Sequence, residues 1–220
     1  MLPSALAESI KIEEFRRINK TMSGMKTDMN SLKVPRQGLL GIWDLIVGPG
    51  MPVSEILLGL IPSLLAAVVV PLYAVLNELG WNAVQLIVAA IIAFDLVGGA
   101  IINVTQTTKH WHHKPEHGFK YHFLFIAFHL HPAVIAWLYI GGDWAYFLFA
   151  YSYLIIAATI ILLSPLPLQR AESILLYMGT IVLNNYVFTT VPGMEWFLPI
   201  YFLKLLVCYL PQEPISLSNG

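Results

Sequence analysis

The feature that most restricts the fold is a succession of long apolar segments separated by short polar ones. A hydrocarbon core about 30 Å thick is crossed by a helix of about 17 to 25 residues, and only helices and closed barrels satisfy their own backbone groups there. We therefore expect an all-α, polytopic integral membrane bundle of about six transmembrane helices. The expected spans are residues 56–76, 83–104, 121–140, 144–163, 174–190 and 196–209.

The composition supports a location in the bilayer. Hydrophobic residues make up 57% of the chain and charged residues 11%, with a mean hydropathy of +0.70. The charged share of a soluble domain is about 25%. A separate soluble catalytic domain is therefore not expected, and the spread-out basic residues match no nucleic-acid-binding motif.

Three regions are expected along the chain. Residues 1–52 form a polar and basic extension with short interfacial helices, at residues 8–20 and 39–47. Residues 53–212 form the transmembrane bundle, which includes a histidine-rich loop at residues 105–120. Residues 213–220 form a C-terminal tail.

The basic residues predict the orientation of the bundle. Seven of the twelve Lys and Arg residues precede the first long apolar run, and four more lie in the loops after the second and fourth spans. Cytoplasmic loops carry an excess of Lys and Arg, so both termini and the histidine-rich loop are expected in the cytoplasm. The twelfth, Lys204, lies inside the last span, and we expect its side chain to extend to the interface.

All seven histidines lie between positions 110 and 131. If the second span stays helical to about residue 113, Asp95, Asn103, His110 and His113 share one face. On the third span His122 and His129 share a face, and His131 points to the opposite side. Antiparallel packing would then place Asp95 and His129 roughly 15 Å and 12 Å inside the boundary, where they could meet.

These residues define a candidate site. Asp95 and His129 are the candidate catalytic pair, because a carboxylate inside a span is costly unless it is paired or protonated. Neutral imidazoles bind zinc and iron, so a divalent metal is expected on His110, His113, His117, His122 and His129. Asn103 and Asn184 would line a polar cavity. The structural alternative is that these groups make hydrogen bonds between helices.

Membrane-embedded fatty acid desaturases and hydroxylases also keep histidines at the cytoplasmic ends of their spans. The spacings here are His-x-His-His, His-x-x-x-His and His-x-His within one region. That family distributes boxes of the His-x-x-His-His type along the chain. The patterns differ, so neither its residues nor its activity is carried over.

Three functions remain open from the sequence. The first is a metal-dependent enzyme that acts at the cytoplasmic interface on a lipid or another hydrophobic substrate. The second is a transporter or channel for protons, a metal cation or a small solute. The third is a non-catalytic subunit or assembly factor that docks a cytoplasmic protein.

Overall fold

The computed structural model describes residues 13, 16, 34–188 and 191–212. Every regular element within these residues is a helix, which confirms the expected all-α class. The expected C-terminal tail and nearly all of the helix at residues 8–20 lie outside the described residues. The elements are α2 (Leu39–Val47), α3 (Val53–Leu76), α4 (Ala83–Ile102), α5 (Gln106–His112), α6 (Phe119–Ala127), α7 (His131–Tyr139), α8 (Trp144–Leu163), α9 (Leu166–Tyr186), α10 (Phe197–Phe202) and the π-helix η1 (Leu203–Tyr209).

Four helical stretches are long and apolar enough to cross a membrane. They are α3, α4, α8 and the stretch Phe119–Tyr139 that joins α6 to α7. The helix α9 has 21 residues but is less apolar, and the last apolar stretch, Phe197–Tyr209, is shorter. By length and composition the chain has the helices of a multi-pass membrane protein.

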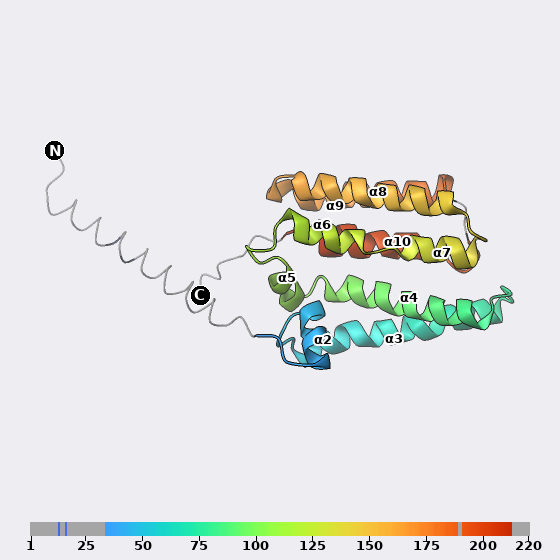
Figure 1. Ribbon diagram of the computed structural model, residues 1–220, viewed down its shortest axis with the longest axis horizontal. Coiled ribbons are helices and arrows are strands. Elements are labelled where there is room, and N and C mark those ends of the chain that lie inside the picture. Colours follow the sequence, from blue (N-terminus) through green and yellow to red (C-terminus); the bar gives the residue numbers. More distant parts are fainter. Residues whose placement is uncertain (1–12, 14–15, 17–33, 189–190, 213–220) are drawn as a thin grey trace.

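The long helices lie side by side along one direction, as Figure 1 shows. The hairpin of α3 and α4 forms one side of the bundle, and α8 and α9 form the other. The α6–α7 stretch and the α10–η1 segment lie between them. The helix α3 packs mainly on α4, whereas α4 also packs on η1, α10 and α7.

Glycines allow α3 and α4 to approach closely. A Cβ atom added to Gly59 would lie 2.5 Å from Cδ1 of Ile102, and one added to Gly98 would lie 2.3 Å from Oγ of Ser63. Small residues at such crossings are typical of helix pairs in membranes, where close van der Waals packing replaces the hydrophobic effect. The two helices therefore form a tightly joined hairpin.

The α10–η1 segment is the centre of the bundle. Its side chains at Phe197, Tyr201, Phe202, Leu205 and Leu206 are all 0% exposed. Its 13 residues would rise about 20 Å as an α-helix, which is less than a hydrocarbon core. The segment packs against α4, α8 and α9, so its backbone is surrounded by protein.

One end of the bundle holds α2 and α5 (Figure 1). The expected interfacial segment is indeed a helix, α2, with an exposed apolar face. The last carbonyls of α2 accept hydrogen bonds from α5: Leu45 O from Trp111 Nε1 at 3.0 Å, Ile46 O from His112 Nε2 at 2.8 Å, and Val47 O from Thr108 Oγ1 at 2.7 Å. Side chains of α5 thus cap the end of α2.

The segment 105–120, which was expected to be a loop, therefore contains a short helix. The helix α4 ends at Ile102, and α5 begins after Thr105, whose hydroxyl accepts a hydrogen bond from the Thr108 amide. The expectation of one helix that continues to residue 113 is wrong because the chain turns between α4 and α5. His110 and His113 therefore do not continue the face of α4 that carries Asp95.

Candidate functional site

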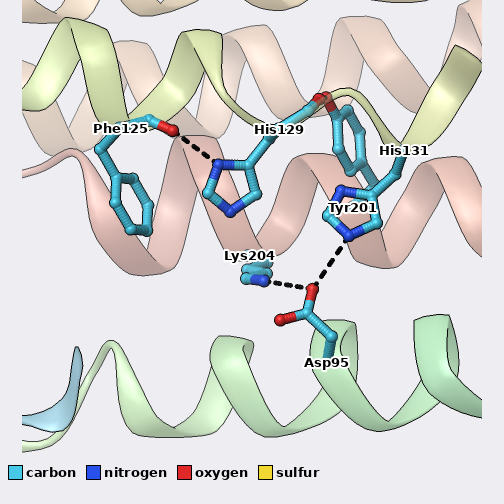
Figure 2. Close-up of polar contacts among 6 residues, drawn as sticks. All are labelled: Asp95, Phe125, His129, His131, Tyr201 and Lys204. Atoms are coloured by element: carbon cyan, nitrogen blue, oxygen red, sulfur yellow. Dashed lines mark hydrogen bonds and ion pairs between the residues drawn. The ribbon is translucent and has the colours of Figure 1, made fainter. Parts of the chain in front are cut away.

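Two ionisable side chains, from two other segments of the chain, contact the carboxylate of Asp95. Lys204 Nζ donates a hydrogen bond of 2.6 Å to Asp95 Oδ2, and His131 Nε2 lies 3.2 Å from the same oxygen. Figure 2 shows Asp95 on α4, with Lys204 and His131 turned toward it from η1 and from the start of α7. We call these three residues the Asp95 cluster.

The Asp95 cluster lies well inside the bundle. Asp95 is twelve residues from the start of α4 and seven from its end, about 18 Å and 10 Å along the helix. Its side chain is 44% exposed, whereas that of Lys204 is 4% exposed. In a bundle that crosses a membrane this depth would lie in hydrocarbon, so exposure would not return the carboxylate to water. The lysine supplies the counter-charge that an intramembrane carboxylate needs.

Lys204 is the site residue that the sequence reasoning placed wrongly. The side chain does not extend to the interface but turns inward onto Asp95. Gly99 makes this possible, because a Cβ atom there would lie 2.4 Å from Cε of Lys204. The backbone also changes from α-helix to π-helix at Leu203, and such π-helical turns are frequent at functional sites.

A break between α6 and α7 brings His131 to Asp95. The helix α6 ends at Ala127, and α7 begins at His131 with Pro132 in its first turn. The prediction that His131 points away from the face of His129 assumed one unbroken helix, and it is wrong. Pro132 has no N–H and its ring would clash with the carbonyl of Phe128 in a continuous helix, so the helix is interrupted and restarts with a different rotation at His131.

The carbonyls released by this break have their own donors. Tyr151 Oη donates to Ala127 O at 2.8 Å, and Tyr201 Oη donates to His129 O at 2.5 Å. His129 Nδ1 donates to Phe125 O at 2.7 Å (Figure 2). Backbone that is not helical is tolerated at membrane depth only when it is satisfied within the protein. The fold therefore stabilises the break, because side chains satisfy the carbonyls that it frees.

His129 stands next to the Asp95 cluster rather than in it. Its ring centroid lies 5.6 Å from that of His131. The ion pair and hydrogen bonds of Asp95 go to His131 and Lys204. Asp95 was predicted to pair with His129, but its partner is His131. The sequence feature that could have indicated this is Pro132, which interrupts the helix.

The predicted metal ligands are occupied by other contacts. A ring nitrogen of each of four of them donates to a backbone carbonyl: His110 to Gln106 O, His113 to Tyr209 O, His117 to His112 O and His129 to Phe125 O. Among the residues that the structure describes, no three His, Cys, Asp or Glu side chains are grouped to hold a metal ion. The turn before α5 separates His110 and His113 from Asp95, and the expected zinc or iron site stays a prediction.

At the end that carries α2 and α5, a second set of side chains surrounds Tyr209. Lys109 Nζ donates to Tyr209 O at 3.2 Å and to Pro211 O at 2.8 Å, and His113 Nε2 donates to Tyr209 O at 2.9 Å. Burial lowers the pKa of His113 to about 3 and also lowers the pKa of His112. Both rings are therefore neutral, and their N–H groups cap the carbonyl ends of η1 and α2.

The two predicted cavity residues lie on different parts of the bundle. Asn103 caps α4 and is buried, and its Nδ2 has no hydrogen-bond partner. Asn184 is on α9, which packs against α8, α10 and η1. The structure does not record a contact that joins either amide to the Asp95 cluster.

No protein-family model, curated protein or solved structure matches this sequence.

Proposed function

We propose that the protein carries protons across a membrane, alone or together with a small solute or cation. The Asp95 cluster is the observation that carries the proposal. Ionisable groups inside transmembrane helices are costly and typically mark proton relays or ion pathways. Broken helices at membrane depth, like the break before His131, are typical of transporter binding sites.

The proton acceptor in this proposal is His131. Its Nε2 faces Asp95 Oδ2, while its Nδ1 is buried without a hydrogen-bond partner. In the proposed cycle a proton enters at Nδ1, and His131 then places a second cation beside the Asp95 carboxylate. Lys204 then shares one carboxylate with a second cation, so the Lys204–Asp95 pair weakens.

The same ion pair connects the two halves of the bundle. Asp95 belongs to the α3–α4 hairpin, and Lys204 belongs to the central segment that packs with α8 and α9. Weakening the pair would release the hairpin to shift against the remaining helices. Movement of one helical unit against another around a fixed site is the usual basis of alternating access.

Flux measurements test the proposal. Wild-type protein in liposomes should acidify the lumen under an imposed pH gradient, as read by an enclosed pH-sensitive dye. Asp95→Asn and His131→Gln should abolish this flux. Asp143→Asn is the matched control, because Asp143 lies in a connection where its side chain caps α8, and Asn caps a helix equally well. Flux in Asp95→Asn equal to that of wild type would remove the cluster from the pathway.

We also propose that α9 and the α10–η1 segment cross the membrane, which gives six passes with both termini in the cytoplasm. The end that holds α2 and α5 is here called the basic end, because the helices and connections there carry Arg36, Lys109, Lys114, Lys120 and Arg170. The connections at the opposite, acidic end contain Glu78, Asp143 and Glu195 and no Lys or Arg. This asymmetry favours a cytoplasmic basic end.

Cysteine mapping tests the orientation. In a Cys208→Ser background, Glu116→Cys should react with a membrane-impermeant maleimide only from the cytoplasmic side. Gly142→Cys should react only from the other side. The reverse pattern would invert the orientation, and labelling of both positions from one side would contradict the expected number of passes.

A metal-dependent enzyme is the second candidate. It is favoured by His113 Nδ1 and His122 Nε2, two buried ring nitrogens without hydrogen-bond partners. Against it, the Lys204 ammonium on Asp95 would repel a metal cation there. Elemental analysis of protein purified without a histidine tag separates the candidates, because the enzyme requires stoichiometric zinc or iron. A non-catalytic subunit stays a prediction, which crosslinking to a cytoplasmic partner would test.

A further inference from the structure

We propose that protons reach the Asp95 cluster from the basic end along a ladder of ring side chains, and that Phe125 is the apolar gate within it. We call His113, His122, Tyr209, Phe125, His129 and His131 the ring ladder. The inference deepens the proposed function, on which it rests, by naming the side of entry and the gating residue. The argument begins at the basic end.

The outer part of the ladder is made of titratable rings. The His113 and His122 rings stack with centroids 4.6 Å apart, and His122 Nδ1 shares a hydrogen bond of 3.1 Å with the Tyr209 hydroxyl. His122 is 0% exposed, yet its Nε2 and the Nδ1 of His113 have no hydrogen-bond partner. The charged and titratable groups that face these rings are Lys109, His112, His117 and Tyr121.

The inner part of the ladder is the neighbourhood of Asp95. The ring centroids of His129 and His131 are 5.6 Å apart, and His131 Nε2 reaches Asp95 Oδ2 at 3.2 Å. The titratable groups that face these two rings are Lys204, Asp95 and Tyr201. The inner part therefore gathers proton-binding groups around Asp95, although no hydrogen bond joins His129 to His131.

Phe125 separates the two parts. Its ring stacks on Tyr209 with centroids 3.9 Å apart and lies 4.6 Å from the His129 ring on its other side. Figure 2 shows the Phe125 and His129 rings side by side, the first extending from α6 and the second from the break that follows it. A phenyl ring can neither donate nor accept a proton. Passage from Tyr209 to His129 therefore requires the ring to swing aside and admit water.

Beyond Asp95, toward the acidic end, apolar side chains of α4, α7 and α10 fill the space next to the cluster. They are Ala89, Ile92, Ile135, Ala136, Phe197 and Leu198, all at most 4% exposed. The polar contacts of the Asp95 cluster thus continue toward one end of the bundle, and this asymmetry assigns proton entry to the basic end.

The transfer balances as a proton relay. A hydronium ion at the basic end gives its proton to Nε2 of His122 and becomes water, and Nδ1 of His122 passes a proton to the Tyr209 hydroxyl. From Tyr209 a proton passes to the admitted water beside His129, and from that water to Nδ1 of His131. The intermediate groups return to their neutral forms, and His131 is left as an imidazolium beside Asp95.

The first test removes the gate. Phe125→Ala should increase passive proton leak into liposomes by about tenfold or more, as expected when a barrier falls by about 1.4 kcal/mol. Phe125→His, which keeps a ring but adds a proton-binding nitrogen, should also increase it. Phe123→Ala is the matched control, because Phe123 is on the same helix and stacks on Phe119 outside the ladder. Equal leak in Phe125→Ala, Phe125→His and Phe123→Ala would overturn the gate.

The second test does not depend on transport. In a Cys208→Ser background, His122→Cys should react with a small methanethiosulfonate reagent added at the basic end. His129→Cys should react only when Phe125→Ala is also present. Ile126→Cys, on the same helix and also 0% exposed, should not react. Labelling in this pattern without proton flux would support the ladder and refute the proposed function. Flux with His129→Cys equally unreactive in both backgrounds would refute the ladder alone.

Discussion

The helix α3 and the α10–η1 segment show opposite relations between hydropathy and burial. The helix α3 has a mean hydropathy of 2.3 over its most apolar window, yet only 11% of that window is buried. The α10–η1 segment is too short to count among the long spans, yet it forms the centre of the bundle. In a bilayer, high hydropathy marks contact with lipid, whereas contact with other helices marks the core of the protein.

This difference decides where polar groups lie. The helix α3 faces lipid along most of its length, so its polar positions are few: Ser63, for example, bonds its own helix at Gly59 O. The central segment is surrounded by helices, and it carries Lys204 onto Asp95. A charged side chain is tolerated inside a membrane where protein supplies its partner.

The largest expected effect compares two leucines in these regions. Leu205→Ala in the central segment should destabilise the protein by about 2 kcal/mol or more, because a packed side chain at 0% exposure leaves a cavity. Leu65→Ala in α3, where the side chain is 60% exposed, should change stability by at most about 0.5 kcal/mol. Reversible unfolding in detergent measures both. Equal effects would show that the two regions do not differ in packing.

A smaller effect is expected at the contact between the hairpin and the central segment. Gly99→Ala places a methyl group 2.4 Å from Cε of Lys204, so it should cost about 1 to 3 kcal/mol and reduce proton flux. Gly80→Ala is a control for the loss of glycine alone, because nothing lies within 4 Å of its Cβ position, although its φ of +71° adds backbone strain. If the proton flux of Gly99→Ala equals that of wild type, the position of Lys204 does not affect transport.

The smallest effect is a pH dependence of stability at the basic end. Burial lowers the pKa of His113 to about 3, below its ordinary value of about 6.5, so the folded protein binds fewer protons than the unfolded chain between these values. The contribution of His113 is complete above about pH 6.5 and is lost as the pH falls toward 3. His113→Gln keeps a donor for Tyr209 O and should flatten the melting temperature across this window. A melting temperature that depends on pH as strongly in His113→Gln as in wild type would contradict the assignment of this effect to His113.

The sequence predicted the four long apolar helices well but the site only in part. The helices α2 and α8 have the expected bounds, because turn-forming residues limit their apolar runs. Gly48 follows the end of α2, and residues 141–143 precede the start of α8. Asp95 was singled out by the cost of its charge. Its partners were not, because they depend on two local changes of helical phase.

Those two changes lie at Pro132 and at Leu203. The first resets the rotation of the third span, so that His131 replaces His129 beside Asp95. The second is a π-helical stretch, which no simple spacing rule anticipates. The histidines have a second use that their clustering did not predict. Several of them donate to backbone carbonyls, two of which lie at helix ends.

A double-mutant cycle on Asp95 and Lys204 tests the central claim most directly. Asp95→Asn and Lys204→Met each leave one charge without its partner, and each should lower the free energy of unfolding by about 3 kcal/mol. The double variant should regain much of that loss, with a coupling energy well above about 1 kcal/mol. Two losses that simply add would contradict an ion pair between α4 and η1 inside the membrane.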